Sequence, residues 1–228
     1  MRRFPATAVV IAAGGEGRRL GSRLPKALVP LAGAPLFLHS VRTFARLAFV
    51  REIAVVLPAA WVERVRRSHG SALARLKVTA LVAGGARRQD SVRAGLEATS
   101  SPIVLVHDAA RPLVTAAAVR DVARAAARHG AALLAAPAVD TVKVVDARRR
   151  VAETPERSRV WLAQTPQGFR RAVLETAYRR NGSREATDDV QLVERAGGQV
   201  VVVPGNASNF KVTTREDLAR AEIVLDSA

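Results

Sequence analysis

The stretch that decides the fold is Ala8-Val-Val-Ile-Ala12, which runs directly into Ala13-Gly14-Gly15-Glu16-Gly17-Arg18-Arg19-Leu20-Gly21. The apolar, β-branched residues predict a buried strand, and the glycines that follow end it. Glycines after a first strand let the backbone approach a phosphate closely, with its amides turned toward the anion. Pro25-Lys26 follow, so Arg19 and Lys26 place two cations around the same turn. This stretch predicts an α/β fold whose first turn binds a triphosphate.

The rest of the chain repeats the alternation of strand and helix. Apolar runs that end in Gly, Pro or polar residues are separated by segments with helical spacing. Such continuously apolar runs are typical of parallel strands covered on both faces. We therefore predict an α/β fold, Rossmann-like and doubly wound, with a mostly parallel sheet. The expected strands are residues 8–12, 53–57, 78–82, 103–106, 131–136 and 200–203, and the expected helices are 35–44, 61–68, 89–98, 116–129, 215–225 and two that begin at 170 and 188.

The alternation breaks after Pro137. Two runs rich in valine, residues 141–146 and 151–154, flank a polar turn of three arginines at 148–150. This pattern predicts a β-hairpin. We expect a projecting β-arm at about residues 138–162 that pairs with another subunit. No linker, repeat or low-complexity segment interrupts the sequence, so residues 1–228 are predicted to form one domain.

The composition limits the class of protein. The absence of Cys excludes disulfides and thiolate metal sites. No apolar run approaches the ~20 residues needed to span a bilayer, which predicts a cytoplasmic protein with no membrane partner. The formal net charge is +16, but the arginines are scattered and aromatic residues make up only 4% of the chain, too few for base stacking. We expect a field that favours polyanionic substrates and no nucleic-acid partner; an arginine-rich nucleic-acid-binding protein is the remote alternative.

Two other phosphate-binding turns are disfavoured. A dinucleotide fingerprint needs a third glycine where Leu20 stands and an acidic residue at the end of the second strand, but that strand closes with Leu57-Pro58. A Walker loop needs Gly-Lys-Ser/Thr, which the turn lacks. The chain contains only four lysines; where Arg is the default cation, a Lys indicates a need for its compact charge. Lys26 is such a candidate.

Further motifs lie in order along the chain. They are Asp90-Ser91-Val92-Arg93-Ala94-Gly95-Leu96, Val106-His107-Asp108-Ala109-Ala110-Arg111-Pro112, Asp140-Thr141-Val142-Lys143, Gln164-Thr165-Pro166-Gln167, Thr187-Asp188-Asp189 and Asn209-Phe210-Lys211-Val212-Thr213. With the glycine turn, they resemble the blocks of the 2-C-methyl-D-erythritol 4-phosphate cytidylyltransferase family over residues 6–225. The resemblance implies transfer of CMP from CTP to this sugar-alcohol phosphate, with release of pyrophosphate, in the synthesis of isoprenoid precursors. A ribitol-5-phosphate cytidylyltransferase is the alternative, because a few pocket residues could change the acceptor.

The resemblance also implies a role for each matching residue. Arg19 and Lys26 match the catalytic cations that hold the triphosphate and the pentavalent transition state. No general base is needed, because a phosphomonoester is already largely dianionic at neutral pH. The implied nucleotide site is Ala13, Gly14, Gly15, Gly17, Gly84, Gly85, Ser91 and Asp108, and the implied acceptor site is Asp108, Arg111, Thr141, Arg157, Thr187 and Lys211.

Some of these residue roles have an alternative, and some imply a metal ion or a second subunit. Gly84, Gly85 and Ser91 match the part of the family that reads the cytosine, although Ser91 could instead cap the helix that begins nearby. Ala86 stands where many relatives carry an acidic residue, which leaves base selectivity open. Asp108 is the expected ligand of Mg²⁺ or another divalent cation. Thr141 and Arg157, for which Arg159 is an alternative, are expected to complete the acceptor site of a neighbouring subunit, which implies a homodimer through the arm; His107 is expected to pack structurally.

Overall fold

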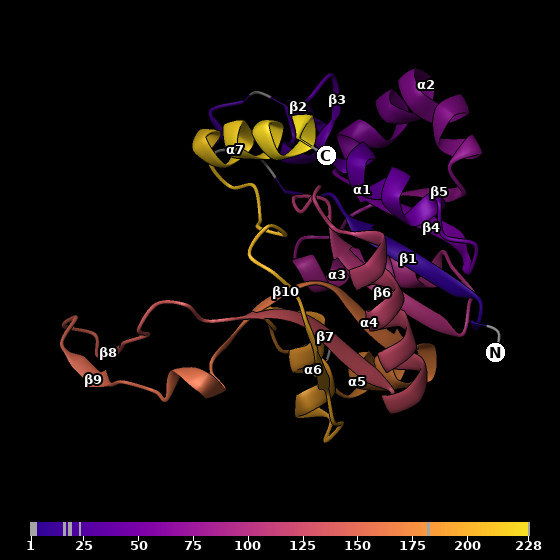
Figure 1. The fold of residues 1–228 in the computed structure, drawn as a ribbon. Helices are drawn as coiled ribbons and strands as arrows, with labels where there is room; N and C mark the ends of the chain where they lie inside the picture. Colours follow the sequence, from indigo (N-terminus) through magenta and orange to yellow (C-terminus); the bar gives the residue numbers. More distant parts are fainter. Residues whose placement is uncertain (1–3, 16, 18–19, 23, 182, 228) are drawn as a thin grey trace.

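The computed structural model describes residues 4–15, 17, 20–22, 24–181 and 183–227. Its main element is one mixed sheet in the strand order β11-β7-β10-β6-β1-β4-β5 (Figure 1). The strand pairs in this sheet are parallel except those of β10, which runs antiparallel to both of its neighbours. The predicted, mostly parallel sheet is thus confirmed. The strands are β1 (Thr7–Ala12), β4 (Val50–Leu57), β5 (Val78–Ala83), β6 (Ile103–Asp108), β7 (Ala131–Pro137), β10 (Trp161–Arg170) and β11 (Val201–Pro204).

Helices cover both faces of the sheet (Figure 1). Alternate residues of β1 enter different cores: Val9 and Ile11 pack into one cluster and Val10 into the other. This burial on both sides explains why the strands read as continuous apolar runs. On the first face lie α1 (Leu36–Ala45), α2 (Ala59–Arg75) and α4 (Ala116–His129), and on the second lie α3 (Arg88–Glu97), α5 (Arg171–Asn181) and α6 (Asp189–Arg195).

Helix α3 lies unusually close to the sheet because of Gly95. A Cβ atom at Gly95 would come within 2.4 Å of Val10 Cγ1 and 2.9 Å of Val56 Cγ2, so only a glycine allows this approach without movement. The close packing fixes the first turn of α3 beside the end of β1. Residues 88–91 are thereby brought to the edge of the sheet where the glycine turn begins.

Strand β10 is an element that the sequence pattern did not predict. Its middle reads Gln164-Thr165-Pro166-Gln167, and polar residues with a proline are typical of a loop rather than of a central strand. The strand forms nevertheless, because its register with β7 shifts between Ala163 and Gln167 and its buried polar side chains find partners. Gln167 Nε2, for example, donates to Asp188 Oδ2 at 3.0 Å.

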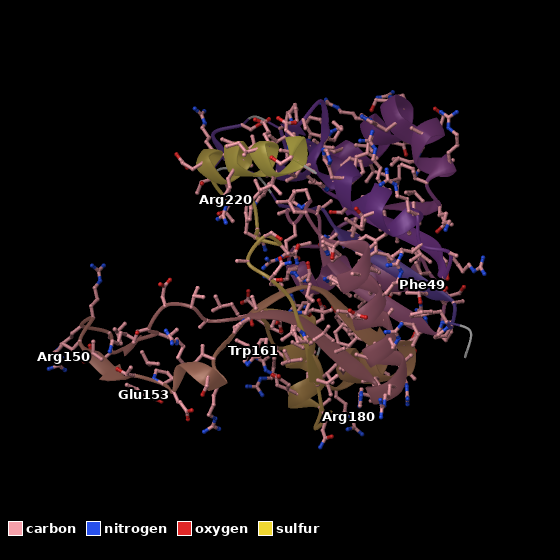
Figure 2. The ribbon with its side chains drawn as sticks, viewed as in Figure 1. Phe49, Arg150, Glu153, Trp161, Arg180 and Arg220 are labelled. Carbon is pink, nitrogen blue, oxygen red and sulfur yellow. The ribbon has the colours of Figure 1, made fainter. Side chains whose placement is uncertain are left out.

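The predicted hairpin is present and forms the arm. Strands β8 (Val144–Val145) and β9 (Val151–Glu153) pair antiparallel and project well beyond the sheet (Figure 1). They are shorter than expected, and β8 ends before Asp146 because Asp146 organises the turn: its Oδ1 accepts from the backbone N–H groups of Arg148 and Arg150, each at 2.9 Å. A short 3-10 helix, η3 (Arg157–Arg159), leads back to β10. Figure 2 shows Arg150 and Glu153 toward the far end of the arm and Trp161 at its root.

The last helix, α7 (Arg215–Asp226), packs over a short hairpin near the glycine turn (Figure 1). That hairpin is β2 (Pro30–Leu31) with β3 (Ala34–Pro35), and η2 (Lys26–Leu28) precedes it. A small core that includes Leu31, Val212 and Ala221 joins these parts. Residues 209–214 are therefore held beside the end of β6. In the described part of the chain, no helix combines the length and the apolar character needed to cross a membrane.

Candidate active site

A cavity of about 460 Å³ lies at the carboxyl ends of β1 and β6. Ligands of open parallel sheets bind at this edge. Its walls come from the glycine turn, the start of η2, residues 85–91, the end of β6 and the segment before α7. The fold thus gathers motifs that lie far apart in the sequence. The predicted residues that line the cavity are Ala13, Gly14, Gly15, Gly17, Lys26, Gly85, Ser91, Asp108 and Lys211.

The glycine turn closes back onto Lys26. The Lys26 backbone N–H donates to the Gly15 carbonyl at 3.0 Å. Gly17 has a φ of +70°, and a Cβ atom there would lie 3.0 Å from the backbone nitrogen of Lys26, so both conformation and space require glycine. At Gly14 and Gly15, by contrast, the nearest atoms of the described residues to a Cβ would be 3.8 and 3.9 Å away. The described part of the chain leaves room for a side chain at these two positions, which line the cavity.

Ser91 joins the second glycine pair to α3. Its Oγ accepts from the Gly85 backbone N–H at 3.2 Å and donates to the Arg87 carbonyl at 3.3 Å. A Cβ atom at Gly84 would lie only 2.7 Å from this Oγ, so Gly84 supports the cavity wall from behind. Ser91 is not the cap of α3: Asp90 accepts from the Arg87 backbone N–H at 3.1 Å and closes a capping box.

Asp108, the last residue of β6, is the acidic residue among the described residues of the cavity wall. Its Oδ1 accepts from Arg88 Nη2 at 3.2 Å, and its Oδ2 accepts from Lys211 Nζ at 2.7 Å. Burial by itself would raise the pKa of Asp108, but the charges of Arg88 and Lys211 outweigh burial and hold that pKa well below its usual range. Asp108 is therefore ionised at neutral pH.

Arg88 is a site residue that the sequence did not reveal. Its Nη1 donates to Asp189 Oδ2 at 2.7 Å, while Nη2 reaches Asp108. Asp189 is fully buried, and its Oδ1 accepts from the Tyr178 hydroxyl at 2.7 Å. Arg88 follows Arg87 in an arginine-rich chain, so the sequence alone indicates an ordinary surface arginine. The only local signal at Asp189 is its place in the first turn of a helix.

His107 supports the site from beneath and does not face the cavity. It is fully buried, with Nδ1 3.0 Å from Thr165 Oγ1 and Nε2 3.1 Å from the Arg111 carbonyl. The Arg111 carbonyl can only accept, so Nε2 carries the ring hydrogen and Nδ1 accepts from Thr165 Oγ1, which itself accepts from the Asp108 backbone N–H at 3.1 Å. Burial lowers the pKa of His107 to about 4, which leaves the ring neutral at pH 7.

Four of the predicted acceptor residues do not line this cavity. Arg111 donates from Nη1 to the Asn209 carbonyl at 2.6 Å, which fixes the segment that carries Lys211. Thr187 is exposed, and its neighbour Asp188 caps α6 by accepting from the Gln191 N–H at 3.0 Å. The other two, Thr141 and Arg157, lie on the arm; Arg157 Nη1 donates to the Val139 carbonyl at 3.0 Å, and Arg159 belongs to the same 3-10 helix. Arg19 lies outside the described residues.

The cavity fits a metal ion only in company with a ligand. Within the described part of the chain, no group of three or more His, Asp or Glu residues is arranged to hold a metal. Mg²⁺, however, is commonly bound through one or two carboxylates together with substrate phosphates. Asp108 supplies one such carboxylate at the cavity wall. The donor set therefore suits a divalent cation that enters with a polyphosphate.

Comparisons with known proteins agree on one family. The family model described as 2-C-methyl-D-erythritol 4-phosphate cytidylyltransferase matches residues 7–227. The bifunctional enzyme IspD/IspF of Anaeromyxobacter dehalogenans is 48% identical over 96% of this chain and 56% of its own length. The 2-C-methyl-D-erythritol 4-phosphate cytidylyltransferase of Syntrophus aciditrophicus is 40% identical over 97% of this chain and 96% of its own length.

Solved structures give the same result. The crystal structure of 2-C-methyl-D-erythritol 4-phosphate cytidylyltransferase from Thermus thermophilus superposes with a TM-score of 0.79 at 36% identity, covering 97% of this chain and 99% of that one. The 4-diphosphocytidyl-2C-methyl-D-erythritol synthase of Anaerococcus prevotii gives a TM-score of 0.84 at 28% identity, covering 98% of this chain and 100% of that one. The chain therefore spans about half the length of the bifunctional relative and nearly all of the length of the two relatives named only as 2-C-methyl-D-erythritol 4-phosphate cytidylyltransferase.

Proposed function

We propose a mechanism from one premise: the chain belongs to the 2-C-methyl-D-erythritol 4-phosphate cytidylyltransferase family, whose model matches residues 7–227. It is a nucleotidyltransferase that transfers CMP from CTP to 2-C-methyl-D-erythritol 4-phosphate in isoprenoid precursor synthesis. The products are 4-diphosphocytidyl-2-C-methyl-D-erythritol and pyrophosphate. The predicted family and reaction are confirmed, and the comparisons give no support to the ribitol 5-phosphate or nucleic-acid alternatives.

The meeting of Lys26, Asp108 and Lys211 at the glycine turn is the observation that carries the proposed mechanism. An oxygen of the acceptor's phosphate attacks the α-phosphorus of CTP, and the bond from that phosphorus to the pyrophosphate oxygen breaks. The acceptor phosphate needs no base, because it is already largely dianionic. Catalysis then consists of positioning the two substrates and stabilising the charge that spreads over the phosphoryl oxygens. A cavity lined by cations and close backbone amides suits this task.

The residues divide between the two substrates. Lys26, with Arg19, stabilises the triphosphate and the transition state, while the amides of the glycine turn approach the phosphates. Gly85 and Ser91, which line the cavity, contact the cytosine, and Gly84 supports Ser91 from behind. Lys211 binds the phosphate of the acceptor. Arg111 supports this last role by holding the carbonyl of Asn209, and Thr187 approaches the acceptor from the start of α6.

Asp108 would hold a divalent cation, Mg²⁺ in our proposal, that enters with the triphosphate. When bound, the ion would neutralise charge on the phosphates and withdraw electrons from the reacting phosphorus. The protein's own contribution is to keep Asp108 ionised, which the charges of Arg88 and Lys211 do by holding its pKa low.

We also propose that the enzyme acts in the cytoplasm.

The arm supports a homodimer with shared sites. Val139, Val144, Val145 and Val151 on the arm are between 44% and 75% exposed, and an apolar surface of this kind indicates a protein partner. Thr141 and Arg157 lie on the same arm and do not line the cavity described above. We propose that they complete the acceptor site of a second copy. The seven strands that share one sheet support a single nucleotidyltransferase domain for each copy.

Mixed dimers test this arrangement. Lys26→Ala and Arg157→Ala homodimers are both expected to be nearly inactive, because every site in them lacks one group. After the two variants are mixed and allowed to exchange subunits, about half of the dimers are mixed and carry one intact site, so about a quarter of the wild-type activity should return. Activity is measured before and after exchange, and Arg159→Ala replaces Arg157→Ala as the matched alternative. Failure of both mixtures to regain activity would count against shared sites.

The glycine turn makes a second prediction. Gly14→Ala is expected to leave the melting temperature unchanged, since the nearest atom of the described residues to the new methyl group is 3.8 Å away. CTP affinity should fall by about tenfold or more, because the methyl occupies the space that a phosphate must enter. Gly17→Ala is the matched control and should lower stability as well, by about 1 kcal/mol or more. Calorimetry of CTP binding and thermal melts separate the two effects; unchanged CTP affinity in Gly14→Ala would refute the placement of the triphosphate.

The reaction is tested directly by pyrophosphate release. Purified protein is incubated with CTP, Mg²⁺ and 2-C-methyl-D-erythritol 4-phosphate, and parallel reactions contain each other nucleoside triphosphate or ribitol 5-phosphate. We expect turnover that requires CTP and methylerythritol phosphate. Turnover that prefers ribitol 5-phosphate would change the acceptor, whereas folded protein that releases no pyrophosphate with any pair would contradict the function.

A further inference from the structure

Five side chains form a continuous series of hydrogen bonds from the interior to the cavity. The Tyr178 hydroxyl donates to Asp189 at 2.7 Å, and Arg88 bridges Asp189 at 2.7 Å and Asp108 at 3.2 Å. Lys211 closes the series at 2.7 Å from Asp108. The five groups come from α5, α6, α3, β6 and the segment before α7. The series therefore links the second face of the sheet to the reacting groups.

The two cations on Asp108 are held very differently. Arg88 has a second carboxylate, Asp189, whose side chain is 0% exposed and whose backbone N–H is fixed by Gln167 Oε1 at 3.0 Å. For the Lys211 ammonium, Asp108 is the partner among the described residues, and the Lys211 side chain is 43% exposed. A planar guanidinium is also suited to span two carboxylates, whereas an ammonium is a compact charge on a flexible stem.

This difference decides which cation stays when a substrate arrives. A phosphate that enters the cavity competes with Asp108 for a cation, because both are anions. Lys211 can exchange at the loss of one hydrogen bond. Arg88 cannot move toward the phosphate without leaving Asp189 buried and unpaired, which is strongly unfavourable. Asp108 therefore keeps Arg88 as its counter-ion and releases Lys211.

We propose that Arg88 is a positioning residue for CMP transfer: fixed by Asp189, it holds the Asp108 carboxylate in place in the cavity while Lys211 leaves to bind the acceptor phosphate. The inference rests on the roles proposed above for Asp108 and Lys211. Arg88 contacts neither substrate in this scheme and acts only through Asp108. Tyr178 and Asp189 matter because they fix the guanidinium.

The principal test removes both charges of the buried pair at once. The double variant Arg88→Gln/Asp189→Asn leaves no unpaired buried charge, and the amide oxygen introduced by Asp189→Asn can still accept from the Tyr178 hydroxyl. We expect cooperative melting near the wild-type temperature and a fall in kcat of about ten- to a hundredfold at saturating substrates. Arg93→Gln is the matched control: it removes an arginine that pairs with Glu97 on the exposed side of the same helix, and it should leave kcat unchanged.

A double-mutant cycle with Asp108→Asn distinguishes positioning from a structural or direct role. In the Asp108→Asn background, adding Arg88→Gln/Asp189→Asn should lower the residual kcat by less than about threefold, because groups that act through one another are not additive. A full additional loss would overturn the proposal, since Arg88 would then act on substrate independently. An unchanged kcat in the wild-type background would overturn it as well.

A milder variant keeps the inference testable if the double variant does not fold. Tyr178→Phe retains every charge and removes only the hydroxyl that fixes Asp189. We expect kcat to fall about two- to fivefold, a loss that disappears in the Asp108→Asn background; a loss that persists there, or no loss at all, would overturn the proposal. Wild-type protein that transfers no CMP would contradict the proposed function instead, so the two failures are distinguishable.

Discussion

Replacing Lys26 by alanine is expected to lower kcat about a hundredfold or more and to leave the fold intact. The side chain lines the cavity at the glycine turn, where it meets the triphosphate and the charge that develops on it. The backbone N–H that bonds the Gly15 carbonyl at 3.0 Å is retained in the variant, so the turn keeps its closure. Single-turnover measurements with saturating CTP report the chemical step directly.

Two further variants test whether the position and shape of the Lys26 cation matter or only its positive charge. Arg67→Ala removes an exposed arginine from α2 that does not line the cavity, and it should leave turnover unchanged because a distant surface charge is screened. Lys26→Arg keeps the charge but adds a broad planar group next to Gly15, where a Cβ would lie 3.9 Å from Lys26 Cβ. We expect it to remain far below wild type, since the two cations are not interchangeable at close quarters. Near-normal turnover of Lys26→Ala would contradict the mechanism.

Local patterns were sufficient to predict the parallel strands of the sheet and its first turn. The inner parallel strands β1, β4, β6 and β7 are largely buried, so each apolar run is complete within a few residues and can be recognised without knowledge of its neighbours. The glycine turn is equally local, because the φ of +70° at Gly17 is required by the turn itself. Motifs of this kind can be recognised from adjacent residues alone, because their conformation depends on those residues.

Strand β10 could not be predicted by the same reasoning. Its central residues are polar and include Pro166, and they become a buried strand only because distant groups satisfy them. Gln164 Nε2 donates to the Asn206 carbonyl at 2.8 Å, and Thr165 Oγ1 accepts from Asp108 across 57 residues of sequence. Such partners are known only after the chain has folded, so the tertiary context overrides local propensity here.

The pair of Arg88 and Asp189 shows the same limit in the site. The two residues are 101 positions apart, and each has an ordinary local explanation as a surface arginine or an acid in a first helical turn. What makes them unusual is the burial of Asp189 and its bond to Tyr178. Resemblance to a family marks residues that match its motifs, but the arrangement of supporting charges behind them has to be read from the structure.

Asp108→Asn is expected to separate turnover from nucleotide binding. In Mg²⁺ the variant should lose about a hundredfold or more in kcat, because an amide is a poorer ligand for a hard cation than a carboxylate and gives Lys211 and Arg88 no counter-charge. Without metal, by contrast, CTP should bind at least as tightly as to wild type. The cavity loses its described acidic group and becomes more attractive to a polyanion.

These opposite signs make the measurement decisive. CTP binding is followed by calorimetry in excess chelator and turnover by pyrophosphate release in Mg²⁺, with Asp121→Asn as the control: Asp121 pairs with Arg124 on the exposed face of α4. A purely structural role for Asp108 predicts that binding and turnover fall together, because a collapsed cavity accepts neither nucleotide nor acceptor. Loss of turnover with retained or tighter binding requires instead that the carboxylate acts on the reacting complex, and it would identify the end of β6 as the place where charge on the phosphates is balanced.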